Sequence, residues 1–370
     1  MEATSLYLVE IELSLAFFGA ILFFYQVFSK GHLLFKADIN VAVLAVLSTL
    51  WLVLADTEGR WLGLKATLFV CCMYFSIKFP RQSMLCLALL AFMGFFIDNI
   101  AGGIYLSKHV GINANQILTV PFALIFCAIY LYQRKENINL SLLYFVVCLD
   151  IFSAFSIGAR AAAISAILLI CFVGSKKASN IFLKFAQWIP IFYIAIVLIS
   201  YYSLMFEIEW MPATPSNIER SSMIFAAVSH FFEYPFTGPK EEFDQLSGQA
   251  IEIFDMALYD NLNGVDPHNF FLSLWRDEGS TLTLLWIFAW FQYWNTLRRL
   301  KLQLDETRVR VVIGMLAIAV VQFSLSPPST GTRLLVALIM GTALGFAYQG
   351  SSVKANDLSN QKPKLENGVV

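Results

Sequence analysis

The stretch DPHNFFLSLWRDEG, residues 266–279, ends the one long polar segment of a chain that is otherwise made of apolar runs. The polar segment begins near residue 206, and a new apolar run follows by Leu282. The stretch also places His268, whose side chain titrates near neutral pH, next to the amide of Asn269. The boundary therefore predicts a long loop that carries its reactive side chain close to the point where the chain becomes hydrophobic again.

The composition around this stretch is that of a membrane protein. Of 370 residues, 58% are hydrophobic and only 14% are charged, and the mean hydropathy is +0.67. Soluble domains carry roughly a quarter charged residues. The net charge of -1 offers no basic face for nucleic acid. All six cysteines fall inside apolar runs, away from histidine, and are interpreted as small buried side chains and not as metal ligands.

The apolar runs are long enough to cross a bilayer as helices, the structure that satisfies the backbone in lipid. We expect an all-α polytopic membrane protein with about eleven transmembrane helices, or twelve if one is missed. The expected spans are 7–28, 39–55, 61–78, 83–100, 116–133, 138–157, 159–174, 181–205, 281–297, 309–326 and 331–349.

Most lysines and arginines fall in one set of connections, which the positive-inside rule assigns to the cytoplasm. The long loop is then external, and the N-terminus is external with eleven spans and cytoplasmic with twelve. Four regions follow from this topology: an N-terminal bundle of about eight helices, an external loop, the C-terminal spans and a disordered polar tail. Their expected bounds are 1–205, 206–280, 281–349 and 350–370.

The first half of the external loop predicts a helix. It opens with Pro215 and a Ser216-to-Glu219 capping box and ends by Tyr234, before a proline. One side is apolar, which favours a helix lying along the membrane surface. Arg220 falls on that apolar side, either reaching out to the lipid headgroups or facing a bound anion. The opposite, polar side carries Glu219, Ser222, Ser229, His230 and Glu233.

Further charged residues gather toward the external side. Arg160 and Arg333 open two of the expected spans, and Asp98 and Asp150 fall in the outer halves of two others. Ionisable groups at membrane depth are costly and usually face a partner or a cavity. This gathering predicts a polar site near the outer leaflet.

Three motifs, in this order, resemble the bacterial O-antigen ligases and O-antigen polymerases, which use glycans linked to undecaprenyl diphosphate. They are the sequence GARAAA at 158–163, the helix from Arg220 to Tyr234 running into PFTG at 235–238, and His268-Asn269 separated by nine residues from Gly279. The chain departs from the family where Gly238 is followed by proline instead of completing a Gly-x-Gly, and where Ala159 replaces a common serine. Both ligase and polymerase remain open.

The resemblance implies inverting transfer of a lipid-linked glycan to an acceptor hydroxyl on the periplasmic face of the bacterial inner membrane. His268 is the expected general base, and Arg160, Arg220 and Arg333 are expected to bind the diphosphate. Asp266, Asn269, Gly238 and Gly279 are expected to support the site. No carboxylate cluster of the magnesium-binding kind is present in the sequence, so we expect no metal ion and no cofactor.

The expected partners are the undecaprenyl-diphosphate donor, an acceptor on lipid A-core or on a glycan, and the lipid bilayer. One dominant external loop favours a ligase of lipopolysaccharide biosynthesis over a polymerase of repeat units. A lipid-linked glycan flippase or an ion- or proton-coupled transporter is a further alternative. A transporter would place its ionisable residues near the membrane midplane.

Overall fold

The computed structural model describes residues 69, 72–99, 120–133, 138–156, 160–206, 215–233, 249, 269–300, 302, 304–325 and 335–348. Within these ranges the regular elements are helices and no strand occurs, so the all-α class is confirmed for the described residues. The helices are α4 (Pro80–Asn99), α6 (Pro121–Tyr132), α7 (Leu140–Ser156), α8 (Arg160–Gly174), α9 (Lys176–Phe185), the 3-10 turn η2 (Ala186–Trp188), α10 (Ile189–Met205), α11 (Pro215–Glu233), α13 (Phe270–Leu300) and α14 (Glu306–Leu325). Two further helical segments cover 72–78 and Leu335–Tyr348.

Most helix bounds follow the apolar runs, with three corrections. The span expected from residue 116 begins at Pro121, because proline is favoured in a first turn where its missing N–H costs nothing. The span expected over 181–205 begins earlier, at Lys176, and is interrupted by η2 before Pro190. The span expected from residue 281 belongs to α13, which begins at Phe270 and so crosses the expected loop boundary at 280.

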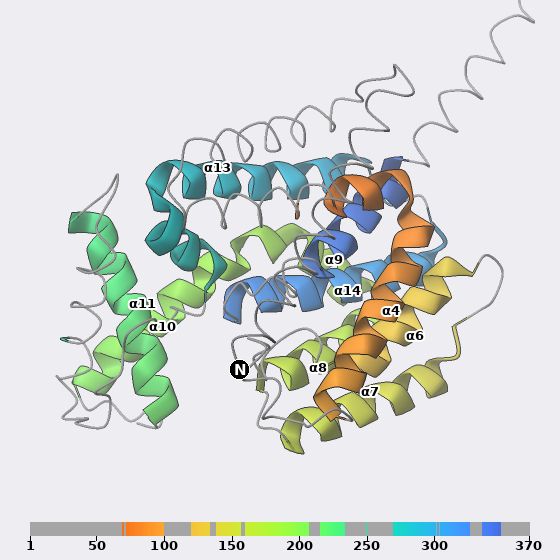
Figure 1. The fold of residues 1–370 in the computed structure, drawn as a ribbon, viewed down its shortest axis with the longest axis horizontal. Coiled ribbons are helices and arrows are strands. Elements are labelled where there is room, and N and C mark those ends of the chain that lie inside the picture. The colour runs from red at the N-terminus through yellow and green to blue at the C-terminus, as the bar shows by residue number, and fades with distance from the viewer. Residues whose placement is uncertain are drawn as a thin grey trace, which may run out of the picture. The chain divides into compact units, whose positions relative to one another are not determined.

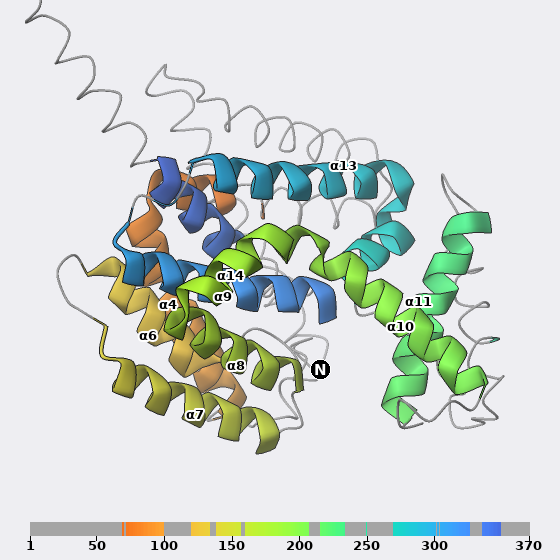
Figure 2. The ribbon, with the colours of Figure 1, turned by 180° about the vertical axis from the view of Figure 1, so that it is seen from behind.

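The chain divides into two compact units. The first comprises Met1–Leu183, Tyr293–Ala319 and Arg333–Val370, and the second comprises Lys184–Gln292 and Val320–Thr332. In the first unit α6 packs between α4 and α7, and α8 packs on α7 (Figures 1 and 2). Residues 311–319 of α14 and 335–347 are buried throughout, as expected for helices that are apolar on all sides.

Glycines set the closest helix contacts of the first unit. A side chain at Gly345 would place its Cβ 2.7 Å from the carbonyl oxygen of Ile77 and 2.8 Å from that of Ser76, and Gly341 meets the preceding turn of the same helix, 72–78. Glycines four residues apart that let two backbones approach are typical of helix pairs in membranes. A Cβ at Gly314 of α14 would lie 2.5 Å from the end of the Leu169 side chain of α8 and 3.3 Å from the Leu169 carbonyl oxygen.

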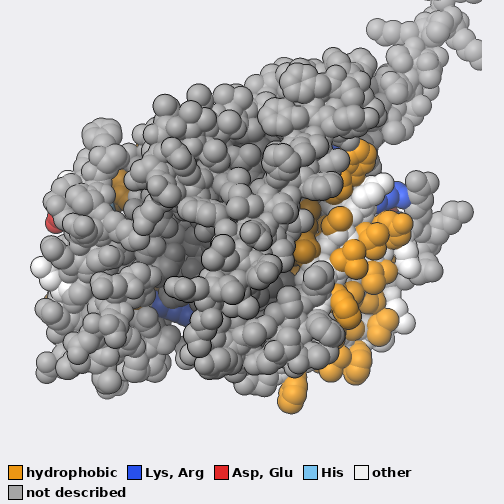
Figure 3. Space-filling view, in the orientation of Figure 1, with side chains coloured by type: hydrophobic (Ala, Val, Ile, Leu, Met, Phe, Trp, Pro, Cys, Tyr) orange, Lys and Arg blue, Asp and Glu red, His pale blue; other side chains and the backbone are white. Residues whose placement is uncertain are grey.

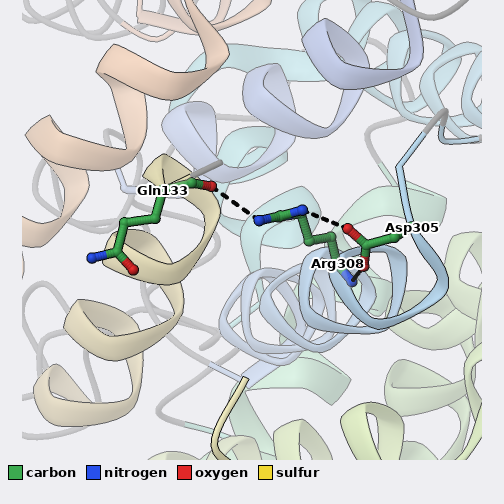
Figure 4. A network of polar contacts seen from close by, with 3 residues as sticks. All are labelled: Gln133, Asp305 and Arg308. Carbon is green, nitrogen blue, oxygen red and sulfur yellow. Dashed lines mark hydrogen bonds and ion pairs between the residues drawn. The ribbon is translucent and has the colours of Figure 1, made fainter. Parts of the chain in front are cut away.

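A polar cluster joins three helix ends of the first unit, and Figure 4 shows the part of it around Arg308. Arg308, in the first turn of α14, donates to the carboxylate of Asp305 at 2.6 Å and to the carbonyl oxygen of Gln133 at the end of α6 at 3.1 Å. Lys176, at the start of α9, forms a 3.0 Å ion pair with Glu306. The sequence assigns all three connections to one side of the membrane, and here they meet at one end of the unit.

Large apolar side chains cover part of the outside of the first unit. Figure 3 shows them over the face where α4, α6 and α7 lie, and they include Leu85, Leu89, Phe92, Phe145, Phe152 and Phe155, between 45% and 76% exposed. By length and composition, one helix in the described residues is able to cross a membrane alone, Lys176–Met205. Several shorter apolar helices accompany it, among them Leu140–Phe155 and Leu335–Tyr348.

In the second unit α10 packs against α11, with the rings of Tyr201 and Phe225 stacked 4.3 Å apart. Burial along α11 does not follow its polar and apolar sides throughout. Ser222 and His230 of the polar side are buried at 0% and 1% exposure, whereas Phe232 of the apolar side is 75% exposed. The protein itself covers part of the polar side, because α10 and the start of α13 pack against this helix.

Candidate functional site

The first turn of α13 is held by Asn269, which is completely buried. Its side-chain oxygen accepts hydrogen bonds from the backbone N–H groups of Phe271 at 3.1 Å and Leu272 at 3.3 Å. An asparagine that satisfies these donors is a helix N-cap. Its side-chain nitrogen donates to the carbonyl oxygen of Ser324, near the end of α14, at 3.4 Å.

Asn269 therefore fixes the point at which α13 begins, and His268 is the residue immediately before it in the chain. His268 and Asp266 themselves lie outside the described residues, as do Gly238 and Arg333. Gly279 is placed inside α13, not in a loop. Asn269 ties the start of α13 to α14, and its supporting role in the site stays a prediction.

Arg220 lies on α11 among buried apolar residues, as its position on the helix predicts. Its neighbours Met223 and Ile224 are buried and the arginine itself is half-buried. The guanidinium Nε atom is shielded from solvent and has no hydrogen-bond partner among the described residues. A buried donor without a partner costs about 1–3 kcal/mol, more when it is charged, so this group is set up to receive an acceptor.

The sequence gives no sign of two further groups that the fold brings to this region. Tyr193 of α10 lies close enough to Arg220 for the positive charge to act on its hydroxyl. The adjacent Ser221 is buried, and its hydroxyl donates to the carbonyl oxygen of Ile218 at 3.0 Å. The nearness of Tyr193 to Arg220 depends on how α10 crosses α11, which a local sequence pattern does not specify.

Contacts between α11 and α13 show the relative direction of the two helices. Leu272 packs on Ala226 and Ala227, and farther along both helices the rings of Phe231 and Trp275 meet at 4.2 Å. Residue numbers rise together along the two helices, so the N-terminal turns of α11 point toward the N-terminus of α13. Arg220 therefore lies toward the same end as Asn269 within the second unit.

The remaining predicted residues belong to the first unit. Arg160 is the first residue of α8, and its side chain lies outside the described set, as does that of Asp98 near the end of α4. Asp150 is buried in α7, and its two carboxylate oxygens accept the backbone N–H groups of Phe122 at 3.1 Å and Ala123 at 2.6 Å. Asp150 thus caps α6, since the first N–H groups of a helix have no partner of their own.

Within the part of the chain that the structure describes, no three histidine, cysteine, aspartate or glutamate side chains are grouped in a way that would hold a metal ion. Among the described residues, this region offers a guanidinium group, a tyrosine hydroxyl and a capped helix start.

Comparisons of the chain with protein-family models, with curated proteins and with solved structures gave no match. The likeness to O-antigen ligases and polymerases accordingly rests on the three sequence motifs.

Proposed function

We propose that this protein is a polytopic glycosyltransferase of the bacterial inner membrane. It transfers a glycan from undecaprenyl diphosphate to an acceptor hydroxyl on the periplasmic side, with inversion at the sugar C1 atom. The order of the motifs supports the proposal, and so do the apolar helices with large side chains facing outward. We further propose about eleven membrane-spanning helices, which agrees with the lengths of the apolar runs.

The half-buried guanidinium of Arg220 is the observation that carries the proposal. Its Nε atom lacks both solvent and a hydrogen-bond partner in the described residues. Arginine is always charged and presents a planar fork of donors that matches phosphate oxygens. A diphosphate bound beside α11 would satisfy this donor and neutralise the charge, so a donor substrate of this kind fits the site.

In the proposed reaction the acceptor oxygen attacks C1 of the sugar, and the bond from C1 to the phosphate oxygen breaks. The diphosphate leaves with the electrons of that bond, and its growing negative charge is stabilised by Arg160, Arg220 and Arg333. His268 accepts the proton of the acceptor hydroxyl. Asn269 contributes by fixing the chain next to that histidine.

The environment of Asp150 bears on the transporter alternative. A proton-coupled transporter needs a carboxylate that exchanges its proton and partners during the cycle. Both carboxylate oxygens of Asp150 are instead engaged by the start of α6. This arrangement favours a structural role, so Asp150 gives no support to transport.

Purified protein in lipid, supplied with a diphosphate-linked glycan and an acceptor, tests the proposal. We expect glycan transfer that persists in EDTA. Turnover that is lost in EDTA and restored by Mg²⁺ or Mn²⁺ would show that the arginines have been assigned the wrong role, and no turnover with any acceptor would refute glycosyl transfer.

A null strain separates the two activities within the family. Loss of a ligase leaves finished polymer on the lipid carrier and lipid A-core without O-antigen. Loss of a polymerase leaves a single repeat unit on the core. We propose ligation, because one external connection dominates.

A further inference from the structure

Arg310 lies one turn inside α14 and is half-buried. Its Nε atom is shielded from solvent and has no hydrogen-bond partner among the described residues. An unsatisfied buried donor is costly, and the cost is larger when the donor is charged. The guanidinium group is thus in the same condition as that of Arg220, although Arg310 belongs to the first compact unit and Arg220 to the second.

Contacts between α14 and α8, within the first unit, show which way Arg310 faces. A Cβ at Gly314 would meet the side chain and the carbonyl oxygen of Leu169, while Glu306 pairs with Lys176, two residues after α8 ends. The two helices are therefore antiparallel. Glu306, Arg310 and Gly314 follow one another at intervals of four residues and so share one side of α14. Arg310 accordingly faces the junction between α8 and α9.

One carboxylate serves two cations at this junction. Glu306 forms a 3.0 Å ion pair with Lys176, and the charge of Arg310, four residues along the helix, acts on the same carboxylate. The neighbouring Asp305 pairs with Arg308 instead, at 2.6 Å. Among the described residues, Lys176 and Arg310 together therefore carry one positive charge that Glu306 does not compensate.

Exposed tyrosines lie close to these cations. The hydroxyl of Tyr144 in α7 would be 3.7 Å from a Cβ at Gly174, which comes two residues before Lys176. Tyr132, at the end of α6, is exposed next to Gln133 of the polar cluster. Tyrosine is enriched where a membrane meets water, and the proposed topology makes this end of the unit cytoplasmic. The cations then lie at the depth of lipid headgroups and within reach of the cytoplasm.

We propose that Arg310, together with Lys176, binds an anionic phosphate group at this end of the first unit. The planar guanidinium fork offers its Nε–H and a terminal N–H to two phosphate oxygens. The phosphate satisfies the shielded Nε atom and neutralises the charge that Glu306 leaves uncompensated. The cytoplasmic placement rests on the proposed topology, whereas phosphate binding is independent of glycosyl transfer.

A phosphate group of this kind has two sources, the headgroup of an anionic phospholipid and a phosphate compound dissolved in the cytoplasm. Two measurements on the purified full chain in detergent, without glycan donor, separate them. Native mass spectrometry compares the retention of phosphatidylglycerol and phosphatidylcholine. Thermal unfolding compares inorganic phosphate with chloride at equal ionic strength. Preferential retention of phosphatidylglycerol identifies the lipid source, and stabilisation by phosphate without a lipid preference identifies the soluble one.

The variants are read in whichever measurement responds. Arg310→Gln should weaken binding about tenfold, a usual loss for a hydrogen bond to a charged group. Arg310→Lys keeps the charge but loses the fork, so we expect a smaller loss, and this variant decides if Arg310→Gln folds poorly. Glu306→Gln removes the competing carboxylate and should strengthen binding several-fold. An arginine that served only to hold the fold would give no such gain.

Arg299→Gln is the matched control, because Arg299 is exposed at the end of α13 in the same unit. It removes an equal charge that salt screens, and binding should change by less than about twofold. The proposal is overturned by no response in either measurement, by an Arg299→Gln effect as large as that of Arg310→Gln, or by weaker binding in Glu306→Gln. Glycan transfer is assayed separately, so its absence beside intact phosphate binding counts against the proposed function alone.

Discussion

Arg308 and Arg220 both lie in the first two turns of a helix, yet their guanidinium groups have opposite surroundings. Arg308 donates to Asp305 and to the carbonyl oxygen of Gln133 and lies 5.3 Å from the ring centre of Tyr130. Arg220 has a shielded Nε atom without a hydrogen-bond partner in the described residues. The protein itself supplies the partners of Arg308, whereas the Nε atom of Arg220, like that of Arg310, has no acceptor among the described residues. At Arg220 we assign this acceptor to the diphosphate of the proposed donor.

The largest effect is expected at His268, next to the buried cap that lies toward the same end as Arg220. His268→Ala should leave donor binding nearly unchanged and lower turnover by about 10²–10⁴, the usual loss when a general base is removed. The residual rate should rise with pH as the acceptor hydroxyl ionises unaided. Donor binding and single-turnover rates measure the two effects. Turnover close to that of the wild type would leave His268 without a catalytic role.

The comparison of the two arginines is tested by the same substitution at both sites. Arg220→Lys keeps the charge but loses the planar fork, so we expect weaker donor binding and turnover lowered by about 10²–10³, the usual cost of losing one preorganised donor. Arg308→Lys should leave turnover within about twofold, because it alters a partly exposed ion pair with Asp305, typically worth about 0–1 kcal/mol, and contacts with Gln133 and Tyr130, which are not part of the proposed donor site. Equal losses of activity at comparable folded yield would remove the distinction.

A third prediction concerns stability in the first unit. Gly345→Ala should lower the free energy of unfolding by about 1–3 kcal/mol, because its methyl group would push against backbone carbonyl oxygens. Gly174→Ala is the control, since the added Cβ would be 3.7 Å from the Tyr144 hydroxyl, an ordinary contact. Thermal unfolding of the two variants in detergent compares their stabilities. A stable Gly345→Ala protein would show that the helix pair is looser than its geometry indicates.

The smallest effect is expected at the exposed Lys176–Glu306 pair. The hydrogen bond from Lys176, together with its charge, lowers the pKa of Glu306. A lowered folded-state pKa stabilises the fold above the ordinary pKa of the carboxyl group, and this stabilisation is lost as pH falls through the lowered value. Glu306→Gln should therefore flatten a shallow acid dependence of thermal stability without changing transfer at neutral pH. A steep loss of stability at neutral pH would contradict this.

The sequence alone locates those helices whose positions depend on residues close together in the chain. Apolar runs define α4, α7, α8 and α14 to within a few residues, and the positions of α11 and of Arg220 on its apolar side follow from proline stops and helical spacing. These features depend on a residue and its near neighbours in the chain. The polytopic membrane fold and the catalytic role of His268 remain predictions, and the residue itself lies outside the described structure.

Only the tertiary structure decided which polar groups obtain partners from distant segments. Asp150 caps α6 by accepting the backbone N–H of Ala123, 27 residues earlier in the sequence, and Asn269 extends α13 back into the expected loop while reaching Ser324, 55 residues away. Ser222 and His230 are buried on the side of α11 that appears polar in isolation. Hydrogen bonding and burial depend on which surfaces meet in space, and a helical periodicity gives the faces of a helix but not the neighbour that covers each one.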